Sequence, residues 1–268
     1  DKDARVMIDL KIPSEYDYQI VEGSVKQTGA RRIEGFSKQL SKNVWSADAD
    51  QNYTIYFVIE FNKDIKKFGG WHDHTLWETD TMTAHYPQRF GCYAEFDTTD
   101  HPEVMVRSGI SYVDMAGASN NLSNEITEPF GWNFEAVHKH QSDSWNNILN
   151  RVRIYSNDYR EKVRFYTNLY RAFCRNTFSD ADRRWVDAAG NIQKLDDPDA
   201  VALGCDAFWN TFWNLNQVWN LIAPEWSSRW VKSQLAMYDA NGWLAKGPSG
   251  MKYIPVMVGE HEIPLLVS

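Results

Sequence analysis

The sequence is poor in cysteine, in runs of positive charge and in long apolar segments. Its 268 residues include three cysteines, Cys92, Cys174 and Cys205, which lie far apart and never in Cys-x-x-Cys spacing. This odd, scattered set indicates neither a disulfide framework nor a zinc knuckle. The net charge of −8, without a basic run, argues against nucleic acid as a partner. No apolar run is as long as a bilayer-spanning helix and no signal peptide opens the chain, so we do not expect a membrane-spanning protein.

Tryptophan, in contrast, is abundant. The chain has twelve tryptophans, and aromatic residues make up 14% of its composition. Some of these rings must fill the core of a protein of this size. Aromatic side chains are also flat, rigid surfaces against which the C–H faces of a ligand can stack. The composition therefore allows a carbohydrate-binding protein as well as an ordinary globular domain.

The first part of the chain, residues 1–113, has the pattern of β-strands. Strands are predicted over residues 4–10, 31–36, 54–61, 90–96 and 103–113. Val6, Ile8 and Leu10 alternate with polar residues, which is typical of a strand with one buried face. Turn residues separate these segments and no helical pattern lies between them. We therefore predict an antiparallel β-sandwich rather than βαβ units.

The second part, residues 114–268, has the period of helices. Helices are predicted over residues 114–126, 134–152, 159–173, 205–222 and 224–238, with a polar loop over residues 176–203. Asp114 is a candidate N-cap, and Asp158 with Glu161 has the spacing of a capping box. The inward stripe of the third helix is expected to comprise Tyr159, Val163, Tyr166, Tyr170 and Phe173. Helices paired by short loops suggest an all-α toroid or bundle.

The predicted helix over residues 205–222 carries an unusual second stripe. Its apolar stripe, at steps of four and three residues, consists of Phe208, Phe212, Leu215, Trp219 and Ile222. Asn210, Asn214 and Gln217 follow the same steps on another face, flanked by Trp209 and Trp213. Buried amides without a partner cost about 1–3 kcal/mol each. Either these amides bond to neighbouring loops in a buried helix, or they meet an external partner with hydroxyl groups and C–H surface, such as a sugar.

Other candidate groups lie in loops. Glu260 and Glu262 at the predicted start of a helix either stabilise its first turn or, with His261, bind a sugar. Asp180 and Asp182 have the pattern of loop-capping residues.

The run over residues 71–74, Trp-His-Asp-His, could place two histidines on one face of a strand. No third metal ligand is spaced to join them, and a loop with Trp71 or Trp77 against a sugar is the alternative.

Several short motifs resemble, in order and spacing, landmarks of glycoside hydrolase family 92. They are Asp97, Val106-Arg107-Ser108-Gly109-Ile110-Ser111-Tyr112-Val113, Asn121-Leu122, Phe165-Tyr166-Thr167-Asn168-Leu169-Tyr170, Phe178-Ser179-Asp180-Ala181-Asp182, Trp209-Asn210-Thr211-Phe212, Asn241-Gly242-Trp243-Leu244 and Met257-Val258-Gly259-Glu260-His261. Members of this family look like calcium-dependent exo-α-mannosidases that invert the anomeric configuration. The resemblance implies a β-sandwich followed by an (α/α)₆ toroid, of which residues 114–268 would be the first helices. It also implies a mannose-containing glycan as partner and a periplasmic or secreted location.

The resemblance implies sugar-binding roles only for residues that match a motif of the family. Together with the aromatic pattern, it gives an expected substrate-binding set that consists of Trp209, Asn210, Trp213, Glu260, His261 and Trp71.

Most family members have an aspartate where this chain has Asn210, so the sugar would meet an amide without the charge. The family's acid, base and calcium ligands lie beyond Ser268, and none of these roles is assigned here. The expected function is thus a portion of an exo-acting α-mannosidase. The alternatives are a non-catalytic carbohydrate-binding protein on the same scaffold, or a purely structural piece.

Overall fold

The computed structural model describes residues 3–11, 18–42, 50–85, 89–204, 207–244, 248–249, 252–253 and 260–267. Residues 205–206 of the predicted fourth helix lie outside these ranges, and so do Met257, Val258 and Gly259 of the last family motif. The chain forms two compact units. The units are Asp1–Trp132 together with Asp180–Asp182, and Asn133–Ser179 together with Arg183–Ser268.

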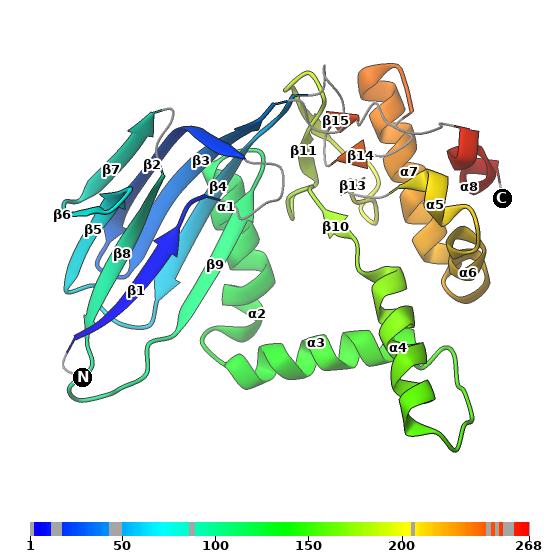
Figure 1. Ribbon diagram of the computed structural model, residues 1–268, viewed down its shortest axis with the longest axis horizontal. Coiled ribbons are helices and arrows are strands. Elements are labelled where there is room, and N and C mark those ends of the chain that lie inside the picture. Colours follow the sequence, from blue (N-terminus) through cyan, green and yellow to red (C-terminus); the bar gives the residue numbers. More distant parts are fainter. Residues whose placement is uncertain are drawn as a thin grey trace. The chain divides into compact units, whose positions relative to one another are not determined.

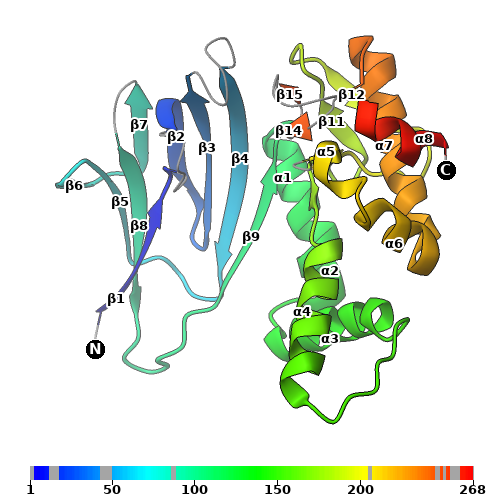
Figure 2. The same cartoon turned by 45° about the vertical axis from the view of Figure 1, so that its right-hand side comes forward.

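The first unit contains two antiparallel sheets (Figures 1 and 2). One sheet has the strand order β1-β8-β5-β6 and the other β7-β2-β3-β4-β9. Their strands are β1 (Asp3–Asp9), β2 (Gln19–Gly29), β3 (Arg32–Ser41), β4 (Gln51–Phe61), β5 (Lys67–His72), β6 (Thr75–Glu78), β7 (Thr81–His85), β8 (Phe90–Asp97) and β9 (Val106–Ser111).

Apolar side chains from both sheets form one core. Val25, Ile33 and Phe61 of the five-stranded sheet and Phe90 and Phe96 of the four-stranded sheet are completely buried in it. The Phe61 and Phe96 rings lie 4.8 Å apart. Two sheets that share one apolar layer make a sandwich, so the predicted antiparallel β-sandwich is confirmed.

A helix covers the other face of the five-stranded sheet. Helix α1 (Met115–Leu122) begins at Asp114, whose carboxylate accepts a hydrogen bond from the backbone N–H of Gly117 at 2.6 Å, as the N-cap prediction requires. Ala118 and Leu122 of α1 pack on Val58 of β4. The helix does not end near residue 126 as expected. It continues through the π-helical turn η1 (Ser123–Thr127) and α2 (Glu128–Phe130), because a proline in the first turn of α2 needs no N–H partner.

The second unit is mainly helical. Its helical elements are α3 (Phe134–Leu149), α4 (Tyr159–Phe173), α5 (Phe208–Thr211), α6 (Leu215–Ile222), α7 (Pro224–Asn241), η2 (Glu260–Glu262) and α8 (Ile263–Val267). Phe208, Trp219 and Trp230 are fully buried in its core, and the two indoles stack with centroids 6.0 Å apart. Pro224 opens α7, and Gly242 ends it in the left-handed conformation with φ of 75°, as predicted.

Two predictions for the second unit are wrong in detail. The inward face of α4 includes Tyr166 and Phe173, as predicted, together with Leu169 and Phe165. Tyr159, Val163 and Tyr170, which were also predicted to face inward, are 78%, 46% and 42% exposed. The expected polar loop over residues 176–203 contains paired strands. They are β10 (Asn176–Thr177) with β13 (Leu203–Gly204), and β11 (Arg184–Val186) with β12 (Ile192–Lys194); a further pair is β14 (Pro248–Ser249) with β15 (Lys252–Tyr253).

Asp180 is more than a loop-capping residue. Its side chain is 5% exposed, and its carboxylate accepts hydrogen bonds from Ser111 Oγ at 2.7 Å and Asn121 Nδ2 at 2.9 Å. The Asn121 carbonyl oxygen in turn accepts from the backbone N–H of Ala181 at 2.7 Å. Residues 180–182 therefore belong to the first unit although the segments on both sides belong to the second. A buried charge with this many partners is costly to disturb.

We expect Gly117→Ala to destabilise the protein, although alanine in a helix usually gains about 1 kcal/mol over glycine. A Cβ atom at position 117 would lie 2.1 Å from Asp180 Oδ2 and 2.6 Å from Ser111 Oγ. Displacing the buried carboxylate outweighs the helical gain, with a net loss of about 1–3 kcal/mol. Urea unfolding measures the effect. Gly29→Ala is the control, because its Cβ would meet Arg32 Cβ at an ordinary 3.6 Å. Equal losses in both variants would contradict the prediction.

Candidate functional site

The predicted helix over residues 205–222 is interrupted. The structure has α5 and α6 in its place, separated by a turn in which Asn214 takes φ of −159° and ψ of −19°. The apolar stripe survives the interruption, since Phe208 and Trp219 are buried and Leu215 packs on the same core. The predicted single stripe of amides does not form, because the residues before the turn and those after it belong to two separate helices.

The side chains around this interruption are accessible. Asn210 and Asn214 are exposed, and Trp213 is 73% exposed. Trp209 is half-buried, and Gln217 donates a hydrogen bond to the Phe212 carbonyl oxygen at 3.0 Å. The alternative in which all these amides are buried and bonded to loops is therefore wrong for Asn210 and Asn214. An exposed indole beside exposed amides can contact both the C–H surface and the hydroxyls of a ligand.

The turn η2 contacts α5 and brings two further predicted residues to this region. The His261 imidazole lies against the Phe212 ring, with centroids 4.0 Å apart and an interplanar angle of 34°. Glu260 is exposed at the start of the same turn. The structure thus places Trp209, Asn210, Trp213, Glu260 and His261 on α5, on the turn after it and on the η2 turn that contacts α5. We refer to these five residues as the α5–η2 site.

Trp71 is located differently from the prediction. It lies on strand β5 rather than in a loop, in the first unit, whereas the other five residues belong to the second. Its ring covers Gly91, because a Cβ atom at position 91 would lie 2.1 Å from Trp71 Cζ2. The neighbouring histidines do not share a strand. His72 ends β5 and packs near Phe90 and Trp77, and Asp73, with φ of 50°, forms the turn that leads to His74.

Buried polar groups near the α5–η2 site were not anticipated from the sequence. Thr211 Oγ1 and both amide atoms of Asn216 are buried, and among the described residues they have no hydrogen-bond partner. The same holds for Oε2 of Glu262, whose side chain is 7% exposed. Burial raises the pKa of Glu262 to about 7. In the sequence Glu262 lies only two residues after Glu260, and this spacing does not predict that one carboxyl group is buried while the other is exposed.

The described residues do not include a metal centre. Within the ranges given above, no group of three His, Cys, Asp or Glu side chains is placed to hold an ion. No helix among the described residues is both long and apolar enough to cross a membrane.

A β-sandwich followed by paired helices, with tryptophans and amides accessible on the helical part, is the architecture of glycoside hydrolases that join a sandwich to an α/α toroid. The chain belongs to glycosyl hydrolase family 92. Residues 117–268 match the catalytic domain of that family, and residues 1–111 match its N-terminal domain. These matches confirm the family that the sequence motifs resemble, and they confirm the predicted fold class.

Solved structures agree with this assignment. The fold is similar to that of a family GH92 α-mannosidase from Bacteroides thetaiotaomicron, with a TM-score of 0.81 and 21% sequence identity. It is also similar to a family GH92 inverting mannosidase from Bacteroides thetaiotaomicron VPI-5482, with a TM-score of 0.79 and 20% identity. These matches cover 98% and 99% of this chain but 34% of each of the other chains. No curated protein matches the chain.

We expect the stability of the protein to fall as the pH rises from about 4.5 to 7, because folding holds the Glu262 pKa above its ordinary value of 4.5. The protonated acid is favoured in the folded state, so the loss is complete once the carboxyl ionises above pH 7. It amounts to about 2–3 kcal/mol from this one group. Glu262→Gln should remove that part of the pH dependence in urea unfolding at pH 5 and pH 8. Glu260→Gln, on the same turn but exposed, is the control. An unchanged pH profile in Glu262→Gln would contradict the prediction.

Proposed function

We propose that this chain is part of an exo-acting, inverting, calcium-dependent α-mannosidase that removes terminal α-linked mannose from glycans. The family membership makes it a glycoside hydrolase sequence. Two structural relatives are mannosidases, and one of them is described as inverting. A further structure of the first relative is a complex with mannoimidazole, which supports a mannose-shaped ligand.

The observation that carries the proposal is the exposure of Asn210 on α5, beside Trp213 and the η2 turn. Asn210 offers both an acceptor oxygen and a donor N–H group, so it can bond two sugar hydroxyls. Trp213 offers an accessible ring for the apolar face of the sugar. His261 and Glu260 add a donor and an acceptor from the neighbouring turn. We propose that these residues bind the substrate. For Trp71 of the first unit we propose a sugar contact on its own account, as the aromatic pattern of the sequence predicts.

Inverting hydrolysis needs a carboxylic acid that protonates the leaving oxygen and a carboxylate that activates water, about 6.5–9.5 Å apart. We assign neither role to a residue of this chain. The family resemblance places both, together with the calcium ligands, in parts of the catalytic domain beyond Ser268. Among the described residues, no three His, Cys, Asp or Glu side chains are placed to hold an ion together. We propose calcium as the cofactor, and a periplasmic or secreted location, from the same resemblance.

One observation favours a second candidate function. Asn210 stands where most family members have an aspartate, and an amide lacks the charge that strengthens a hydrogen bond to a hydroxyl. The chain could therefore belong to a carbohydrate-binding protein that keeps the sugar site without turnover. Assays of the full-length protein on an aryl α-mannoside, with calcium and with a chelator, separate the two. Calcium-dependent release of the aryl group supports the enzyme, and binding without release supports the second candidate.

We expect Asn210→Ala to raise the dissociation constant for methyl α-mannoside at least tenfold, because it removes both hydrogen-bonding atoms at the proposed sugar contact. Asn210→Asp should bind at least as tightly as the original, since a charged acceptor strengthens the bond. Isothermal titration measures both. The control is Asn214→Ala, which removes an equally exposed amide from the turn after α5. If Asn210→Ala binds normally, the proposed role of Asn210 is wrong.

A further inference from the structure

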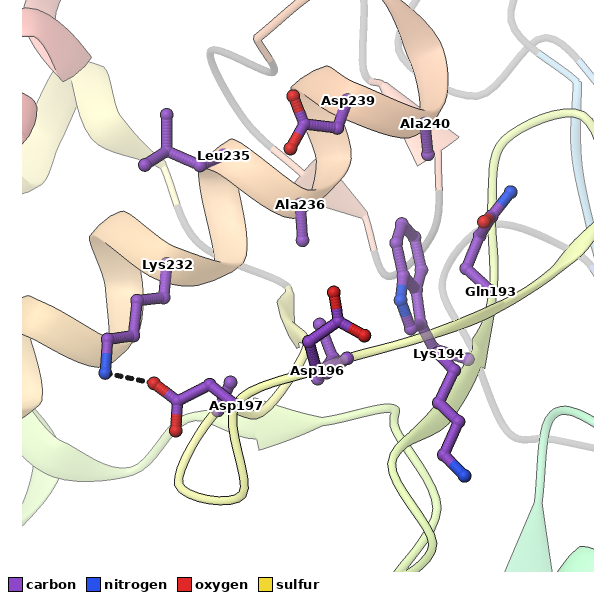
Figure 3. Close-up of a pocket in the computed structure, with 12 residues that line it drawn as sticks. Gln193, Lys194, Asp196, Asp197, Lys232, Leu235, Ala236, Asp239 and Ala240 are labelled. Atoms are coloured by element: carbon purple, nitrogen blue, oxygen red, sulfur yellow. Dashed lines mark hydrogen bonds and ion pairs between the residues drawn. The ribbon is translucent and has the colours of Figure 1, made fainter.

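The second unit contains a cavity that includes none of the residues of the α5–η2 site. Its volume is about 490 Å³, within the range of pockets that bind small molecules. One wall is the stretch of α7 that carries Lys232, Ala236, Asp239 and Ala240. The opposite wall is the segment over residues 193–197, which comprises the end of β12 and the three residues after it (Figure 3). All lining residues belong to the second unit.

The cavity exists because α7 presents small side chains to it. Lys232, Ala236 and Ala240 are spaced four residues apart and so lie on one face of the helix. The two alanines leave open the space that larger side chains would fill. Trp185 of β11 lines the same space, is 2% exposed and packs edge-to-face on Phe178 with centroids 6.0 Å apart. These residues form a rigid apolar part of the cavity.

Hydrogen bonds fix the opposite wall in place. Asp187, which is 2% exposed, accepts from Gln193 Nε2 at 2.8 Å and from the backbone N–H of Asn191 at 2.9 Å, and so holds the hairpin. Arg183 donates from its guanidinium to the Asp196 carbonyl oxygen at 2.8 Å. A wall held in this way can present its side chains to a ligand with little loss of conformational entropy.

The charges around the cavity are of two kinds. Lys232 forms an ion pair with Asp197, and this pair joins the two walls at one end of the cavity (Figure 3). The hydrogen bond from the Lys232 ammonium is the main reason that the pKa of Asp197 lies below its ordinary value. Asp196 and Asp239 also line the cavity, and their carboxylates have no ion-pair or hydrogen-bond partner among the described residues. The Asp196 carboxylate points toward α7 (Figure 3).

This arrangement restricts the chemistry of a ligand. Ionised carboxylates only accept hydrogen bonds, so a ligand that displaces water from the exposed Asp196 and Asp239 must offer donors in its place. Lys232 has three N–H donors, and those not engaged with Asp197 require acceptors. Lys194 also lines the cavity, so the three carboxylates of the cavity stand beside two ammonium groups and a ligand meets charges of both signs. Hydroxyl groups are both donors and acceptors, and a sugar ring adds a C–H face for the two alanines.

We propose that this cavity is a second saccharide-binding site, in which Asp196, Asp239 and Lys232 bond sugar hydroxyls and Ala236 and Ala240 contact the ring, with the buried Trp185 behind them. The choice of mannose as the first sugar to test rests on the proposed function, whereas the saccharide class rests on the cavity itself. Such a site would hold a glycan on the protein through residues other than those of the α5–η2 site.

The test follows Trp185 by ¹⁹F NMR in full-length protein labelled with 5-fluorotryptophan. Its signal is assigned by its loss in Trp185→Phe. Methyl α-mannoside, methyl α-glucoside and methyl β-galactoside are titrated in turn, with spermidine as the cationic probe. We expect at least one glycoside to shift the Trp185 signal in a saturable way and spermidine to leave it unchanged. No shift with any glycoside, or a shift with spermidine alone, would overturn the proposal.

Two variants and a matched control locate the response. Ala236→Phe should abolish the Trp185 shift by filling the cavity, and Asp239→Asn, at an exposed position that tolerates the change, should weaken glycoside binding at least fivefold. Ser228→Phe places the same ring at an exposed position of α7 outside the cavity and should have no effect. Normal Trp185 responses in both cavity variants would contradict the proposal.

Asn210→Ala separates this inference from the proposed function. It should abolish the response of the Trp213 signal and leave that of Trp185 intact. If Trp213 never responds while Trp185 does, the proposed sugar contact at Asn210 fails and the second site stands. If only Trp213 responds, the second site fails alone.

Discussion

The buried carboxylate of Asp180 is the constraint on which the chain path depends. It accepts hydrogen bonds from β9 through Ser111 and from α1 through Asn121, and so ties residues 180–182 into the first unit. Both flanking segments return to the second unit. A carboxylate that is 5% exposed is stable only with such donors, so loss of either one would leave a buried oxygen without its hydrogen bond. The same contact explains why position 117, the third residue of α1, is a glycine.

Much of the fold could be predicted because it follows local rules. Val6, Ile8 and Leu10 alternate as a half-buried strand does, and the N-caps at Asp114 and Asp158 accept the hydrogen bonds that their positions predict. What local rules missed depends on distant contacts. Strand β5 contains Gly69 and Gly70, which lower strand propensity. A side chain at Gly69 would meet the Trp77 carbonyl oxygen of the neighbouring strand, and one at Gly70 would meet Met82 of the facing sheet.

The candidate site was predicted in its residue types and less well in its geometry. The periodicity of the sequence predicted one continuous helix over residues 205–222, because no proline or glycine marks the turn before Leu215. It therefore placed Asn210, Asn214 and Gln217 on one face. It also could not show that Asn216 is buried, since that depends on the packing of α6. The pairing of η2 with α5 joins residues about fifty positions apart and has no sequence signal at all.

Asn210 on α5 and Asp239 in the last turn of α7 are accessible polar groups that lie near the ends of helices. Helix ends leave backbone N–H and C=O groups without intrahelical partners, so the chain there is already polar and exposed to water. Adding exposed side chains such as Asn210 and Asp239 at such places costs little in buried polarity, whereas the same residues in the middle of α6 would displace Trp219 from the core. A helical scaffold that binds hydroxyl-rich ligands is thus expected to carry its contacts on the ends of helices and on the turns between them, and the break between α5 and α6 provides one more such end.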